Sequence, residues 1–72
     1  MTEDLLGRLA ALLSSLDERE ATILKLRYGL SEQHLAPMTL KEIGRVVGLT
    51  RERVRQIERE SLRKLYRIMS GE

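Results

Sequence analysis

The 72-residue chain has no cysteine, tryptophan or phenylalanine, a single proline, one histidine and only two tyrosines. Without thiols and with one imidazole, it offers neither a disulfide framework nor a thiolate or His-rich metal site. Two aromatic rings do not make a stacking platform for single-stranded nucleic acid. No apolar run approaches the ~20 residues that span a bilayer, and an acidic N-terminus replaces the basic region of a secretory signal. We therefore expect a small cytoplasmic protein with no membrane association, no metal and no cofactor.

The sequence also lacks the patterns that carry catalysis. No carboxylate pair, Cys/His arrangement or phosphate-cradling glycine loop occurs at a useful spacing. We therefore expect no catalytic residues and no enzymatic activity.

Charge is distributed unevenly along the chain, although the net charge is only +2. Residues 1–38 carry four basic and six acidic side chains, whereas residues 39–68 carry nine basic and four acidic ones. Such a basic segment attracts polyanions, nucleic acid first among them, although a charge run can also be a solvated helix face.

Apolar periodicity and capping signals predict four helices and no strand. Leucines at helical spacing predict a first helix over about residues 4–15. Capping-box pairs, Asp17 with Glu20 and Thr39 with Glu42, predict helices over about 18–28 and over two turns ending at Gly48. Thr50 can cap a fourth helix that lasts until Gly71, with an inward stripe of Val54, Ile57, Ser61, Leu65 and Ile68. We expect one domain over residues 1–72, with a helical pair and loop over about 4–38 and a second unit over 39–69.

The second unit has the spacing of a helix-turn-helix. A steep crossing over the three residues Gly48, Leu49 and Thr50 needs a small residue at the close approach, supplied by Gly44, and a residue tolerant of positive φ, supplied by Gly48. Apolar anchors stand on both sides of the turn. The predicted fold is an all-α, four-helix domain with a C-terminal helix-turn-helix, of the winged-helix-like DNA-binding superfamily without a wing. The alternative at this point is an ordinary structural hairpin.

If Val54 and Ile57 face inward, the opposite face of the last helix presents side chains that can read bases. Arginine can pair with guanine, glutamine with adenine, and glutamate with cytosine N4, when a recognition helix presents its first turns to the major groove. The expected base readers are Arg51, Glu52 and Gln56. The alternative is that Glu52 and Gln56 are solvated spacers. Phosphate contacts are expected from Arg53, Arg55 and either Lys41 or Arg45.

These segments resemble a known family. TLKEIGRVVGLTRERVRQIERESLRKL, residues 39–65, is similar to the C-terminal DNA-binding segment of bacterial sigma factors of the sigma-70 family, and LDEREATILKLRYGL, residues 16–30, resembles the segment before it. Together they form region 4. The resemblance implies recognition of the minus-35 promoter element as double-stranded DNA and docking on the β-subunit flap of the RNA polymerase core.

The resemblance also implies roles for single residues. Arg51, Glu52 and Gln56 match base-contacting positions, and the backbone-contacting positions are matched by Arg19, Arg27, Arg53 and Arg55. Apolar positions that grip the flap are matched by Tyr28, Leu30, Leu62 and Leu65, for which simple core packing is the alternative. Arg63 and Lys64 match a surface used by transcription activators, but Glu60 and Tyr66 stand where primary members are commonly basic.

Two other functions fit the same features. One is a helix-turn-helix transcriptional regulator that does not act as a polymerase subunit. The other is a sigma-like protein-interaction module held by an anti-sigma factor. Because the family's minus-10 and strand-opening segments are absent from the chain, we expect either an excised domain or a free-standing relative.

Overall fold

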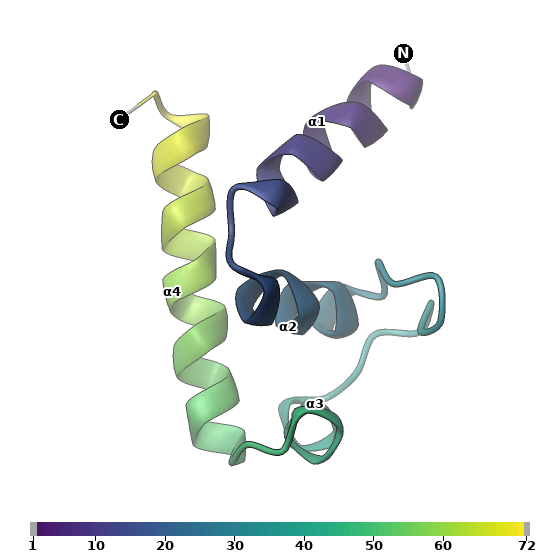
Figure 1. Ribbon diagram of the computed structural model, residues 1–72, viewed down its shortest axis with the longest axis vertical. Coiled ribbons are helices and arrows are strands. Elements are labelled where there is room, and N and C mark those ends of the chain that lie inside the picture. Colours follow the sequence, from purple (N-terminus) through teal and green to yellow (C-terminus); the bar gives the residue numbers. More distant parts are fainter. Residues whose placement is uncertain (1, 72) are drawn as a thin grey trace.

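A computed structural model describes the backbone of residues 2–71 and the side chains of residues 7–71. Within residues 2–71 the regular elements are four α-helices: α1 (Thr2–Ser14), α2 (Glu18–Tyr28), α3 (Leu40–Val47) and α4 (Arg51–Met69). Figure 1 shows α4 along the long axis of the molecule, with α3 beside its N-terminal end, α2 beside its middle and α1 leaning away from its C-terminal half. The predicted all-α fold is confirmed.

The helix ends follow the predicted capping chemistry. Asp17 and Thr39 each accept a hydrogen bond from the backbone of the residue three positions on, and the glutamates there return one, so both capping boxes form. Thr50 caps α4 by accepting from the backbone N–H of Arg53 at 3.1 Å. Gly48 ends α3 at φ 75°, a left-handed conformation that suits glycine.

The core lies where α2, α3 and α4 meet. Its buried members are Ile23 and Leu26 of α2, Ile43 of α3, and Val54 and Ile57 of α4. Ser61, one turn beyond Ile57, is also fully buried and donates to the Ile57 carbonyl at 2.6 Å, which satisfies its hydroxyl without a partner from another helix. Leu49 in the turn before α4 packs against this core, so the turn is held on it.

Gly44 lets α3 and the turn come together. A Cβ atom at this position would lie 2.5 Å from the carbonyl oxygen of Leu49, so any side chain would force the turn outward. The same glycine accepts backbone hydrogen bonds from Gly48 and Leu49, both at 2.9 Å. The predicted close approach at Gly44 is confirmed.

The expected inward stripe of α4 is wrong at its C-terminal end. Ile68 is 46% exposed and Met69 is 72% exposed, whereas Val54 is fully buried. Figure 1 shows α1 diverging from α4. Arg8, Ala11 and Leu12 of α1 line an open hollow with Ile68 and Met69, so α1 covers the last turns of α4 only in part.

Candidate nucleic-acid interface

The N-terminal turns of α4 present the three expected base readers to solvent. Arg51, Glu52 and Gln56 are all exposed, while Val54 and Ile57 between them are buried. One helix face thus anchors α4 to the core and the other is free to enter a groove. The helix is held at its start by the Thr50 cap and by packing of α3 across the Gly48 turn, so these side chains stand on a rigid element.

Within this exposed face, each acceptor has an arginine beside it. Arg55 donates to both carboxylate oxygens of Glu52, from Nε at 2.9 Å and from Nη2 at 2.6 Å. Arg53 Nη1 donates to Gln56 Oε1 at 3.5 Å, at the outer limit of a hydrogen bond. The surface therefore combines donors for phosphate or guanine with acceptors for cytosine or adenine.

The Glu52 carboxylate is held in its charged form. The hydrogen bonds from Arg55 lower the pKa of Glu52 below its usual value, and the nearby charges of Arg51 and Arg59 act in the same direction. An ionised carboxylate is only an acceptor, which is the form that pairs with the exocyclic amine of cytosine.

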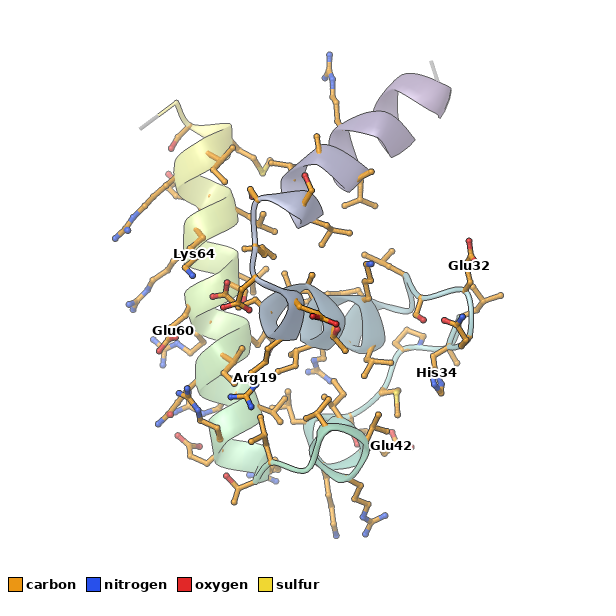
Figure 2. All side chains as sticks on the ribbon, viewed as in Figure 1. Arg19, Glu32, His34, Glu42, Glu60 and Lys64 are labelled. Atoms are coloured by element: carbon orange, nitrogen blue, oxygen red, sulfur yellow. The ribbon has the colours of Figure 1, made fainter. Side chains whose placement is uncertain are left out.

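The expected phosphate contacts are placed on three elements. Lys41 and Arg45 are exposed on α3, one helical turn apart, and Arg53 and Arg55 lie on α4. Arg19 is exposed near the start of α2 and lines a shallow hollow with Thr22 and with Val47 of α3. Figure 2 shows Arg19 projecting from α2 on the side of α3 and the N-terminal half of α4.

Arg27 differs from the other predicted phosphate contacts because its guanidinium is bonded to other elements of the fold. Its Nε donates to Glu58 Oε2 at 3.2 Å and its Nη1 donates to the Met38 carbonyl at 3.0 Å. The phosphate role of Arg27 stays a prediction. Glu58 could not be singled out from sequence patterns because its partner Arg27 lies 31 positions away.

The expected flap contacts are half-exposed, but the four side chains do not line a common hollow in the part of the chain that the structure describes. Tyr28, Leu30 and Leu62 are between 41% and 48% exposed, and Leu65 is more buried. Leu62 lines a hollow on α4 with Tyr66, flanked by three arginines, namely Arg59, Arg63 and Arg67. Tyr28 is tied to α4 from α2, through a hydrogen bond from its hydroxyl to Glu58 Oε2 at 2.9 Å.

The two expected activator contacts have different surroundings. Arg63 is exposed, whereas the ammonium of Lys64 lies 2.7 Å from Oε2 of Glu20, a carboxylate whose side chain is only 7% exposed. Figure 2 shows Lys64 on α4 at the level where α2 begins. Lys64 therefore also joins α4 to the capping box of α2, a role that sequence reasoning missed because the two residues are 44 positions apart.

The fold and the exposed arginine-rich start of α4 define a helix-turn-helix DNA-binding domain. Residues 12–67 match the model of the family described as "Sigma-70, region 4". The chain belongs to this family, as the resemblance of residues 16–30 and 39–65 led us to expect.

Similar proteins are themselves sigma factors. The chain is 43% identical over 65 residues to the RNA polymerase sigma factor RpoD of Helicobacter pylori, an alignment that covers 90% of this chain and 10% of the relative. It is 50% identical over 58 residues to the sigma factor SigA of Listeria monocytogenes, covering 81% of this chain and 15% of the relative. The chain thus spans between a tenth and a sixth of the length of these curated relatives.

Among the described residues, the structure contains no helix long and apolar enough to cross a membrane.

Proposed function

We propose that this domain recognises the minus-35 element of promoters by inserting the start of α4 into the major groove of double-stranded DNA. The observation that carries the proposal is the exposure of Arg51, Glu52 and Gln56 on one face of a helix whose other face is locked into the core. These are the residue types that pair bidentately with guanine and adenine or accept from cytosine. Membership of the sigma-70 region 4 family supports the same role.

Phosphate contacts then position the helix in the groove. Lys41 and Arg45 on α3 and Arg53 and Arg55 on α4 flank the base readers, and Arg19 on α2 extends the positive surface. Such contacts supply affinity and register but no sequence information.

The second partner we propose is the RNA polymerase core, bound through the β-subunit flap. The half-exposed apolar side chains of Tyr28, Leu30 and Leu62 support this docking, since they lie on α2, the following loop and the middle of α4, away from the start of α4. Binding of the apolar face of an amphipathic helix to such side chains is a common mode of recognition. Arg63 and Lys64 remain the proposed contacts for an activator.

The test compares two duplexes and one protein partner. Fluorescence anisotropy should show tighter binding to a duplex that carries a TTGACA element than to the same duplex with that element scrambled. A pull-down with the β flap then separates a polymerase subunit from a regulator that acts alone. Equal affinity for both duplexes would contradict minus-35 recognition. Flap binding without any DNA binding would favour a protein-interaction module.

A further inference from the structure

Glu58 of α4 is bonded to the C-terminal end of α2, and no motif in the sequence assigns it a function. It belongs to α4, two positions beyond Gln56, and its side chain is only 12% exposed. One of its oxygens, Oε2, accepts from two consecutive residues of α2: from Arg27 Nε at 3.2 Å and from the Tyr28 hydroxyl at 2.9 Å. A carboxylate on the recognition helix is thus held by the end of α2.

The same arginine holds the residue that leads into α3. Arg27 Nη1 donates to the carbonyl of Met38 at 3.0 Å, and the Met38 N–H donates to the Leu26 carbonyl at 3.1 Å. Both polar groups of the Met38 backbone are therefore fixed by α2. Since Thr39, the cap of α3, follows directly, the arginine connects the start of α3 to Glu58 on α4.

A network of this kind can act on orientation. Within a partly buried ion pair, much of the attraction is offset by the cost of removing both charges from water, and in some proteins such a pair instead selects one arrangement of the elements that it joins. Base readout requires such an arrangement, since a binding constellation must be held within about 0.5 Å of its productive geometry. Arg51 lies about 10 Å along the helix from Glu58, so a small tilt at Glu58 moves the base readers appreciably.

We propose that the carboxylate of Glu58 is a positioning residue for promoter recognition: through Arg27 and Tyr28 it sets the orientation of α4 against α2 and α3, and so the sequence discrimination of the domain. This inference rests on the proposed DNA-binding function. In this role Glu58 needs no contact with a base.

The experiment uses the fact that a simple charge effect and a positioning effect change the affinity for the TTGACA duplex in opposite directions. Removing a negative charge from a DNA-binding helix should strengthen binding to every duplex through simple electrostatics. For Glu58→Ala we expect weaker binding to the TTGACA duplex. The ratio of the affinities for the TTGACA and scrambled duplexes should fall about tenfold, which equals the loss of one base contact. Glu60→Ala, which removes the same charge from an exposed site on the same helix, is the matched control and should leave that ratio unchanged.

Arg27→Ala and the double variant separate positioning from phosphate contact. If the two residues act as a unit, Arg27→Ala should lower the same ratio, and the double variant should lose no more than either single one. The dependence of affinity on salt should stay as in the wild type. A phosphate contact by Arg27 would instead weaken both duplexes equally and reduce the salt slope by about one unit, which would overturn the proposal.

Folding is followed in parallel so that a loss of structure is not mistaken for a loss of discrimination. Affinities are compared at a temperature where circular dichroism shows each variant folded. If Glu58→Ala does not fold, Glu58→Leu decides, because it keeps a side chain of similar size but offers no oxygen to Arg27 or Tyr28: a lowered ratio supports the proposal and an unchanged ratio overturns it. A wild-type domain that does not discriminate between the duplexes would instead refute the proposed function itself.

Discussion

Arg51 is the first residue of α4 and is exposed beyond the Thr50 cap. We expect Arg51→Ala to cost about 1–3 kcal/mol of binding free energy on a TTGACA duplex and to weaken discrimination at one G·C pair, because the guanidinium can donate two hydrogen bonds to guanine. Anisotropy titrations against duplexes with single base-pair changes measure this. The same loss on random DNA would mean that Arg51 contacts only the backbone.

Arg53 tests the other kind of contact. Its backbone N–H is bonded to the Thr50 cap, and its exposed side chain points away from the core. We expect Arg53→Ala to weaken binding to all duplexes by a similar factor and to reduce the salt slope by about one unit, because a phosphate contact releases counterions without reading sequence. Arg67→Ala, at the far end of α4, removes the same charge and is the control. A shifted base preference in Arg53→Ala would argue against a phosphate contact.

Two glycines shape the helix-turn-helix element, each for a different physical reason. At Gly48 the reason is conformation: φ is 75°, yet a Cβ atom would meet nothing within 4 Å. Gly48→Val should lower the free energy of unfolding by about 1–3 kcal/mol because a β-branched residue is opposed in this region. Gly48→Asn, which tolerates positive φ better, should lose less. Thermal unfolding measures both, and an unchanged stability in the valine variant would contradict the turn geometry.

At Gly44 the reason is space. Its Cβ would lie 2.5 Å from the backbone oxygen of Leu49, which no side-chain rotation can relieve. We expect Gly44→Ala to destabilise the fold by about 1–3 kcal/mol through overpacking. Gly7→Ala in α1 is the matched control, since open space surrounds it and alanine favours a helix by about 1 kcal/mol. Chemical denaturation should move the two variants in opposite directions.

On the scale of the whole molecule, α4 connects the two proposed partners. The start of α4 carries the proposed DNA contacts. Leu62 lies about two turns beyond the core residue Val54 and is 41% exposed. We expect Leu62→Gln to weaken binding of the flap-tip helix at least about tenfold while lowering the free energy of unfolding by only about 1–2 kcal/mol, because 41% of the residue stays exposed after folding. Binding to the flap helix, DNA affinity and thermal stability are measured on the same sample.

Two further leucine-to-glutamine variants serve as references for Leu62→Gln, one at a more exposed site and one at a more buried site. Leu35→Gln, in the loop and 76% exposed, makes the same change away from the proposed docking side chains and should leave flap binding intact. Leu65→Gln lies at a more buried site and should cost more folding free energy, because an unpaired amide and lost packing add there. A Leu62→Gln domain that is stable, binds DNA and still binds the flap helix would exclude Leu62 from the interface.

The amino-acid sequence by itself determined the features that depend only on residues close together in the chain. The capping boxes at Asp17 and Thr39 and the glycines that end α2 and α3 act over three or four positions, so the bounds of α2 and α3 and the turn before α4 could be read directly. The exposed face of α4 also followed from helical periodicity once Val54 and Ile57 were placed inward.

Only the tertiary structure decided which distant side chains meet. Arg27 joins Glu58 across 31 positions and Lys64 joins Glu20 across 44, and periodicity within one helix carries no information about the partner on another. The partly covered end of α4 has the same origin: Ile68 continues the apolar repeat, but it stays 46% exposed because α1 diverges from α4 instead of packing along it. Burial depends on where a second helix lies, and that is a property of the packed molecule.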